Sequence, residues 1–418
     1  MIILSDVFPR CCLKVKPFAP QDRRVKLHIL PSLPNLPTTC RHAIHRRDAQ
    51  NMTPLKGLKV VELARILAGP WVGQSLADLG AEVIKVEAIE GDDTRRWGPP
   101  FIERDDDNTA AYFYSANRGK TSVAADFRTP EGQDTVKRLI AEADILIENF
   151  KVGGLAKYGL DYASLSDLNP RLIYCSITGF GQDGPYASRA GYDFMIQGMS
   201  GLMSITGEPD QQPQKVGVAV TDVVTGLYST IGILAAVEQR HTTGKGQHID
   251  MSLLDCATAL LANQAMNYLA TGQSPARKGN AHPNIAPYQV VPTKDGHIIL
   301  AVGNDGQFQR ACDVLGLTAL GTHPNYATNQ ARVANRDALT ERIEEATQQW
   351  VSVELLDALE RATVPAGPIN SVEDALNNPQ IQARGMVYEA EGVKGVRGPW
   401  TFSDAELALE KAAPKLPK

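Results

Sequence analysis

From residue 58 onward, short apolar runs alternate with longer stretches of helical periodicity. Strand-like runs are expected at 59–63, 82–86, 121–126, 144–148, 172–177 and 248–251. The first helix is expected to begin at Gly69-Pro70 and end before Gly80, and Thr129-Pro130 caps the next. Strands that alternate with helices form a mostly parallel sheet covered on both faces. The sequence therefore predicts an α/β chain with a Rossmann-like large domain.

The pattern changes near residue 285. Two long apolar helices, at 223–239 and 253–269, precede the change. A hairpin over 288–301 and charged amphipathic helices follow it. We expect a large domain over 52–284, a smaller α+β domain over 285–365, and a return of the chain to the large domain over 366–418. Residues 364–368 are expected to form the linker.

The first 51 residues differ from the rest, with nine Lys and Arg against three Asp and no sustained period. We interpret 1–51 as a non-structural N-terminal extension, because Met52 opens an ordinary N-terminus. The alternative is an organellar transit peptide, which would place the protein in the mitochondrial matrix. Removal of 1–51 is expected to leave activity and dimerisation intact.

Composition limits the kinds of partner and the cellular compartment that are expected for this protein. The net charge of −5 gives no reason to expect a nucleic acid or a membrane as partner. Six cysteines without a C-x-x-C pair indicate a reducing compartment, and a cytoplasmic location is expected. No zinc spacing is present, and no apolar stretch of 18 residues is expected to span a membrane.

The residues alone leave several roles open. No G-x-G-x-x-G and no P-loop motif occurs. Asp222 precedes an apolar helix, so it is either the helix N-cap or a carboxylate that the helix dipole holds ionised as a nucleophile. Asp193 is a turn residue or a second acid, and Gly279 to His282 form a plain loop or a mobile lid.

Several motifs in order resemble class III CoA-transferases, the formyl-CoA and carnitine transferase type. They are Arg65-Ile-Leu-Ala-Gly-Pro70, Leu79-Gly-Ala-Glu-Val-Ile-Lys-Val-Glu87, Gly91-Asp-Asp-Thr-Arg95, Asn117-Arg-Gly-Lys120, Glu148-Asn-Phe150, Asn169-Pro-Arg171, Ile177-Thr-Gly-Phe-Gly181 and Thr243-Gly-Lys-Gly-Gln247. The run from Asp93 to Phe101 is similar to the succinyl-CoA-dependent glutarate and hydroxymethylglutarate enzymes. The resemblance covers about residues 55–410 and implies an interlocked homodimer.

The resemblance implies roles for individual residues. Asp222 matches the nucleophile, and Tyr192, Asp193, Gly279 and His282 match supporting positions. The implied CoA-binding positions are Leu67, Ala68, Ala125, Arg128, Asn149, Phe150 and Lys157. The implied reaction moves CoA from succinyl-CoA to a dicarboxylate such as glutarate, with Arg95, Arg96 and His282 as candidates for the distal carboxylate. CoA thioesters are substrates, and no permanently bound cofactor or metal is expected.

Three departures from the family pattern stand out. A glutamine of formyl-CoA transferase is Leu67 here, the lid lacks consecutive glycines, and the last helix of family members is expected to be missing.

Two rival functions remain. An α-methylacyl-CoA racemase of the same fold would need a two-base site, yet Tyr192 stands where those relatives carry histidine. The other rival is a non-catalytic CoA-binding protein.

Overall fold

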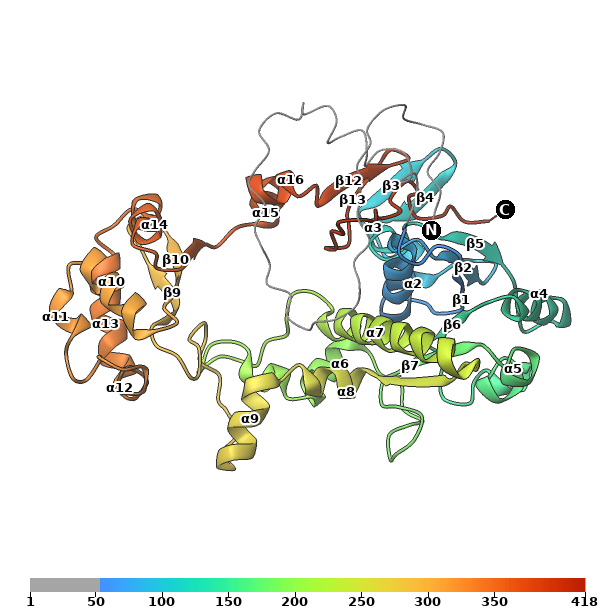
Figure 1. Cartoon of the computed structure of the whole chain (residues 1–418), viewed down its shortest axis with the longest axis horizontal. Coiled ribbons are helices and arrows are strands. Elements are labelled where there is room, and N and C mark those ends of the chain that lie inside the picture. Colours follow the sequence, from blue (N-terminus) through green and yellow to red (C-terminus); the bar gives the residue numbers. More distant parts are fainter. Residues whose placement is uncertain (1–52, 418) are drawn as a thin grey trace, which may run out of the picture. The chain divides into compact units, whose positions relative to one another are not determined.

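The computed structural model describes residues 53–417, so the expected extension at 1–51 lies outside the described residues. Within this range six parallel strands form the largest sheet, in the order β5-β2-β1-β6-β7-β8 (Figure 1). The strands are β1 (Lys59–Glu62), β2 (Glu82–Glu87), β5 (Thr121–Ala124), β6 (Ile145–Glu148), β7 (Ile173–Thr178) and β8 (His248–Ser252). Numbered along the chain within this sheet, the order is 3-2-1-4-5-6, that of the Rossmann fold, with its switch point between β1 and β6. The α/β prediction is confirmed.

The sheet is buried on both faces because adjacent side chains on a strand point to opposite sides. Ile145 and Ile147 pack with helices α2 (Ala68–Asp78) and α7 (Val220–Thr243), whereas Leu146 packs with α4 (Pro130–Ala141) and with α5 (Tyr162–Leu168). Figure 1 shows the two pairs of helices on opposite sides of the strands. Thr129 caps α4 as expected, since its hydroxyl accepts a hydrogen bond from the Gly132 N–H at 3.1 Å.

Helix α2 approaches the sheet very closely, and two glycines allow it. A Cβ added at Gly69 would lie 2.2 Å from the Ala64 Cβ, and one at Gly73 would lie 1.8 Å from the Glu62 Oε2. Either contact is far inside van der Waals distance. The glycines of the Ala68-Gly-Pro-Trp-Val-Gly73 segment therefore let the start of α2 rest directly on the end of β1.

Further short elements connect the sheet strands. They are the hairpin β3 (Phe101–Arg104) and β4 (Asp107–Ala110), the turns η1 (Asp93–Arg96), η2 (Ala156–Tyr158) and η3 (Leu202–Ile205), and the helices α3 (Ala111–Tyr114), α6 (Asp193–Met199), α8 (Leu253–Ala259) and α9 (Ala262–Thr271). The prediction of a single helix over 253–269 is wrong, because two helices, α8 and α9, cover this range. The chain breaks it at Leu260-Leu261, and Ala262 has a φ of +44°.

A second sheet lies beyond residue 285 in the sequence. It contains β9 (Tyr288–Pro292), β10 (His297–Ala301) and β11 (Ala366–Pro368), paired antiparallel. Its helices are α10 (Asp305–Val314), α11 (Thr318–Gly321), α12 (Asn329–Ala334), α13 (Arg336–Thr347) and α14 (Ser352–Arg361). The hairpin is as expected, but the linker at 364–368 is wrong in part, because Ala366–Pro368 bonds to β10 as a third strand. The domain boundaries at 284 and 365 stay a prediction.

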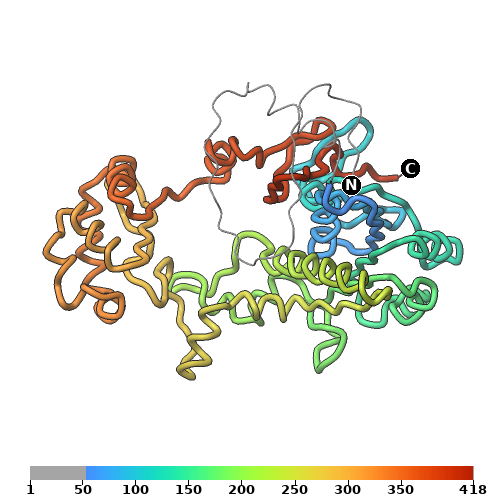
Figure 2. The backbone as a smooth tube through the Cα atoms, in the orientation of Figure 1, coloured from blue at the N-terminus to red at the C-terminus, as the bar shows by residue number. Residues whose placement is uncertain are grey.

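The last segment contacts the parallel-sheet region again. It comprises α15 (Val372–Asn377), α16 (Pro379–Ala383), β12 (Val387–Ala390) and β13 (Val393–Val396). The Ala408 N–H donates to the Asp78 carbonyl, and the Arg118 guanidinium donates to the Val396 carbonyl. Figure 2 shows this red segment beside the blue segment that contains α2.

Helix α7 is longer than expected and begins at Val220 rather than Val223. Within residues 53–417 it is the one helix whose length and composition would suit a membrane span, which differs from the expectation that no such stretch exists. It packs against α2 and β7, while Leu227, Tyr228 and Ile231 on its outer side are exposed. One apolar face of α7 therefore packs inward against α2 and β7, and a second apolar face is exposed on the outer side of the helix.

Candidate functional site

A cavity of about 620 Å³ lies at the carboxyl ends of the parallel strands. Its wall includes residues that follow β1, β2, β5, β6 and β7. Among them, Arg65 to Ala68 follow β1 and Asn149 to Val152 follow β6, on the two sides of the switch point. Doubly wound sheets bind ligands at this position because the loops on the two sides diverge there.

The cavity brings together most of the residues that the sequence singled out. Its wall contains Leu67, Ala68, Ala125, Arg128, Asn149, Phe150, Lys157, Tyr192 and Asp222. Asp193, Gly279 and His282 are outside the cavity wall. All of the expected CoA-contacting positions therefore face one cavity together with the candidate nucleophile.

Asp222 is not a helix N-cap, so that interpretation is wrong. It is the third residue of α7, whose cap position is Ala219 without a side-chain cap bond. The helix starts earlier because Asp193, from another element, provides the missing acceptor. Its Oδ1 accepts from the Thr221 N–H at 2.8 Å and from the Thr221 hydroxyl at 2.7 Å. Asp222 is consequently free of capping and is half-buried in the cavity wall.

The environment of Asp222 favours its protonated form more than the helix position alone suggests. Burial, and next the nearby Asp193 carboxylate, raise the pKa of Asp222 to about 7. At that pKa Asp222 is partly ionised near neutral pH, and the expectation that the helix dipole holds it ionised as a nucleophile stays a prediction. A carboxylate with a pKa near neutrality is more basic, and the poorly solvated anion is a stronger nucleophile than one in water.

Asp193 positions α7 rather than lining the cavity. Its second oxygen accepts from the Gln197 side-chain Nε2 at 2.8 Å, and the Gln197 side-chain Oε1 accepts from the Val216 N–H at 2.9 Å. All of these partners are protein groups. Asp193 thus joins α6 to the first turn of α7 and fixes where Asp222 is presented.

The segment after β1 has a strained backbone. Ile66 has a φ of +72°, which is rare for a β-branched residue and costs on the order of 1–3 kcal/mol. Asn149 holds the neighbouring residue at both of its backbone groups. Its Oδ1 accepts from the Arg65 N–H at 2.9 Å, and its Nδ2 donates to the Arg65 carbonyl at 2.6 Å. Asn149 therefore shapes the cavity wall through the backbone of Arg65.

Aromatic and cationic side chains missed at the sequence level complete the wall. Phe127 lies edge-on to Phe150 at 5.5 Å and to Tyr158 at 5.3 Å between ring centroids. Cations of the wall lie over two of these rings, Arg65 over Phe150 and Lys157 over Tyr158. Lys151 and Arg189 also line the cavity. Their positions just beyond strand ends or in the following loops were the signal that could have identified them.

The proposed contacts for a distal carboxylate lie elsewhere. Arg95 is buried and donates to both oxygens of Glu87, at 2.8 and 2.6 Å. Arg96 donates to the Glu90 carbonyl and to Asp93. The expectation that Arg95 contacts the distal carboxylate of the substrate is therefore wrong, because its guanidinium is already paired with Glu87. Neither arginine is in the cavity wall.

The expected lid residues lie in a separate loop. Gly279 has a φ of +56° and lies against the Glu208 carboxylate. The His282 N–H donates to the Tyr288 carbonyl, and its Nδ1 accepts from the Asn284 N–H at 3.1 Å. Burial and Arg336 lower the pKa of His282. A lid role for this loop stays a prediction.

The chemistry of the cavity follows from its wall. Aromatic rings bind the face of a planar ring, and arginine and lysine bind phosphate or carboxylate. Asp222 adds a carboxylate at the same site. In the described part of the chain no group of three His, Cys, Asp or Glu is arranged to hold a metal ion. The arrangement suits a nucleotide-like, phosphorylated ligand whose reacting carbonyl reaches Asp222.

Comparison with known proteins identifies relatives of this chain. The sequence matches CoA-transferase family III over residues 55–418. A succinate–glutarate CoA-transferase of Agrobacterium fabrum is 58% identical over 371 residues, which cover 87% of this chain and 93% of the relative. The human succinyl-CoA:glutarate CoA-transferase is 43% identical over 345 residues, which cover 82% of this chain and 78% of the relative.

The solved structures agree. A CAIB/BAIF family protein from Brucella suis superposes with a TM-score of 0.80 at 63% identity, covering 88% of this chain and 97% of that one. Rv3272 from M. tuberculosis superposes with a TM-score of 0.78 at 28% identity, covering 87% and 97%. Fold, cavity position and sequence agree: the chain belongs to CoA-transferase family III and is an enzyme that transfers coenzyme A.

Proposed function

We propose that this enzyme transfers CoA from succinyl-CoA to a small dicarboxylate such as glutarate, with Asp222 as the covalent carrier. One observation carries the proposal: a half-buried, uncapped carboxylate lies in the same cavity wall as the aromatic and cationic residues at the switch point. Relatives at 58% and 43% identity carry names for transfer between these two acids. The non-catalytic alternative is discarded, because the chain belongs to an enzyme family.

The proposed reaction begins on the donor. An Asp222 oxygen attacks the thioester carbon of succinyl-CoA, the C–S bond breaks, and a mixed anhydride and CoA thiolate form. The thiolate then attacks the aspartyl carbonyl carbon, the anhydride C–O bond breaks, and succinate leaves. The acceptor carboxylate and the thiolate repeat the two steps in reverse. The last step releases the new acyl-CoA and restores the Asp222 carboxylate.

The proposed reaction steps use only the residues of this chain and the two substrates. Thioester is exchanged for thioester, so the proposed reaction requires no redox step and no permanently bound cofactor. Either covalent intermediate would hydrolyse in contact with water, so closure over the cavity is required. The loop from Gly279 to His282 remains the proposed lid. A racemase is disfavoured because Tyr192, in the cavity wall, stands where those relatives carry the histidine of a two-base site.

The assembly and location are proposals as well. We propose a homodimer, because apolar side chains are exposed on the outer side of α7 and on α9, where Met266, Tyr268 and Leu269 are half or more exposed. A second copy would cover these faces.

The described cysteines, Cys175, Cys256 and Cys312, are free and buried, which agrees with the proposed cytoplasmic location.

Replacement of the nucleophile is expected to abolish transfer while CoA still binds. Asp222→Ala removes the only proposed carrier, whereas the CoA-contacting residues are on other segments. Wild-type protein incubated with succinyl-CoA and then with hydroxylamine or borohydride should carry a modification at Asp222, mapped by mass spectrometry. Full turnover by Asp222→Ala, or a label on a different carboxylate, would overturn the assignment.

Activity should follow the ionisation of Asp222. With a pKa of about 7 the nucleophilic form is lost as pH falls, so kcat/KM for succinyl-CoA should drop about tenfold per pH unit below pH 7 and level off above it. Asp193→Asn removes the like charge and keeps an acceptor for Thr221, so its profile should shift to lower pH. Glu148→Gln is the control, because burial raises the pKa of Glu148 to about 7 too. A profile that Glu148→Gln abolishes would exclude Asp222 as the titrating group.

Dicarboxylates should be better acceptors than monocarboxylates. The cavity wall contains Arg65, Arg128, Lys151, Lys157 and Arg189, so a second carboxylate on the acceptor finds a cation there. Initial rates with succinyl-CoA and equal concentrations of glutarate, succinate, butyrate or acetate provide the measurement. Faster transfer to butyrate or acetate would contradict the proposed substrate class.

The protein in solution should have about twice the mass of the 45.3 kDa chain. Light scattering coupled to size exclusion measures this directly. Ile231→Glu, on the outer side of α7, should lower the mass or the soluble yield, because it places a charge in the proposed interface. Val353→Glu, on α14 and equally exposed, serves as the matched control. A monomeric wild-type protein at micromolar concentration would refute the dimer.

A further inference from the structure

A network of buried charged side chains lies beneath the start of α2. Six side chains contribute, three acidic and three basic, and each residue is at most 4% exposed: Glu62, Lys85, Glu87, Asp92, Arg95 and Lys120. Lys85 lies 3.0 Å from both Glu62 and Asp92, and Lys120 lies 2.8 Å from Glu62. Their charges balance within the buried region.

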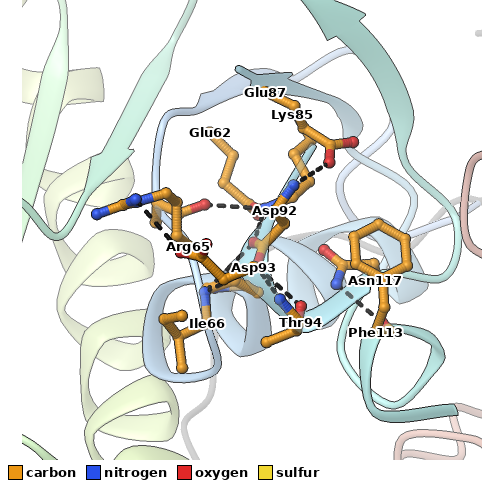
Figure 3. Close-up of polar contacts among 12 residues, drawn as sticks. Glu62, Arg65, Ile66, Lys85, Glu87, Asp92, Asp93, Thr94, Phe113 and Asn117 are labelled. Carbon is orange, nitrogen blue, oxygen red and sulfur yellow. Dashed lines mark hydrogen bonds and ion pairs between the residues drawn. The ribbon is translucent and has the colours of Figure 1, made fainter. Parts of the chain in front are cut away.

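This network also holds the backbone between β1 and α2, as Figure 3 shows for its labelled members. Lys85 donates to the Ala64 carbonyl at 2.8 Å, and Lys120 donates to the Pro70 carbonyl at 2.8 Å. The Ile66 N–H donates to the Asp92 carboxylate at 3.3 Å. These contacts, together with those of Asn149 to Arg65, bind the segment on both sides of Ile66.

Asp92 is oriented for this contact by its own surroundings. Its Oδ1 accepts from the Thr94 N–H at 3.0 Å and from the Thr94 hydroxyl at 2.8 Å. Its backbone N–H donates to Glu87 at 2.8 Å. Burial disfavours a charge on Asp92, but Lys85 and the Thr94 hydrogen bonds outweigh it and lower the pKa of Asp92. The acceptor for Ile66 is therefore a fixed, charged carboxylate.

We propose that Asp92 is a positioning residue that holds Ile66 in its left-handed conformation and so shapes the CoA-binding wall at Ile66, Leu67 and Ala68. The inference rests on the proposed function of the cavity. A β-branched residue does not adopt a φ of +72° unless its surroundings impose it. Asp92 is the side chain that accepts the Ile66 N–H among the described residues, and it lies outside the cavity wall. Its effect on the ligand passes through the backbone.

The experiment uses a variant that relieves the strain itself. Asp92→Asn should weaken CoA binding by about tenfold, because Ile66 loses a charged acceptor and relaxes. Glycine adopts a positive φ without cost, so in an Ile66→Gly background, whose own Kd accounts for the lost side chain, Asp92→Asn should change the Kd by less than about threefold. Full-length proteins are titrated with CoA by calorimetry, and thermal unfolding of each is recorded.

Asp78→Asn is the matched control for loss of a buried ion pair. Asp78 pairs with Arg118 and is fully buried, but neither residue is in the cavity wall. This variant should lower the Tm and leave the Kd for CoA unchanged. Thr94→Val, which removes only one contact to Asp92, should produce a smaller loss of affinity that is absent in the Ile66→Gly background, and it covers the case that Asp92→Asn does not fold.

The outcomes separate the two proposals. Wild-type affinity in Asp92→Asn, or losses from Asp92→Asn and Thr94→Val that are just as large in the Ile66→Gly background, would overturn the positioning role while the wild-type protein still binds CoA. A wild-type protein that does not bind CoA would instead refute the proposed function of the cavity.

Discussion

The buried carboxylate of Glu62 supports the part of the structure on which the cavity depends. It lies at the end of β1, contacts Lys85 and Lys120, and sits directly under Gly73 of α2. Burying a charge is unfavourable unless it is paired, and breaking such a pair leaves the partner uncompensated. Replacing such pairs with apolar side chains often costs no stability, so stability alone does not account for them. Here the two lysines also donate to the backbone, Lys85 to the Ala64 carbonyl and Lys120 to the Pro70 carbonyl.

The site combines two independent supports. One is the loop after β1, held by the charged network and by Asn149. The other is the first turn of α7, held by Asp193 from α6. Asp222 stands on the second, and Leu67 and Ala68, two of the seven residues expected to contact CoA, stand on the first. Because the two supports share no side chain, the distance between the proposed nucleophile and the ligand depends on how α7 packs against α2 and against the parallel sheet.

The electrostatics of the two supports differ. In the network each charged side chain has a partner of opposite charge. Asp222 has no cationic partner among the described residues, and the nearest influence on its pKa besides burial is another carboxylate, Asp193. A carboxylate that exchanges acyl groups must be reactive rather than neutralised by an ion pair. The fold therefore places paired charges where rigidity is required and an unpaired one where chemistry is proposed.

The sequence by itself determined the parallel α/β architecture, the elements of the Rossmann-like sheet and the family, because these depend on local periodicity, on Pro and Gly at helix ends and on motif order. It also indicated nine of the residues that line the cavity. Only the tertiary structure decided that Asp193 caps α7, that Asp222 is therefore uncapped, and that Arg95 is committed to Glu87. It alone revealed the strain at Ile66 and the cations Lys151 and Arg189 in the wall. These features depend on contacts between residues far apart in the chain, and such contacts leave no periodic signal in the sequence.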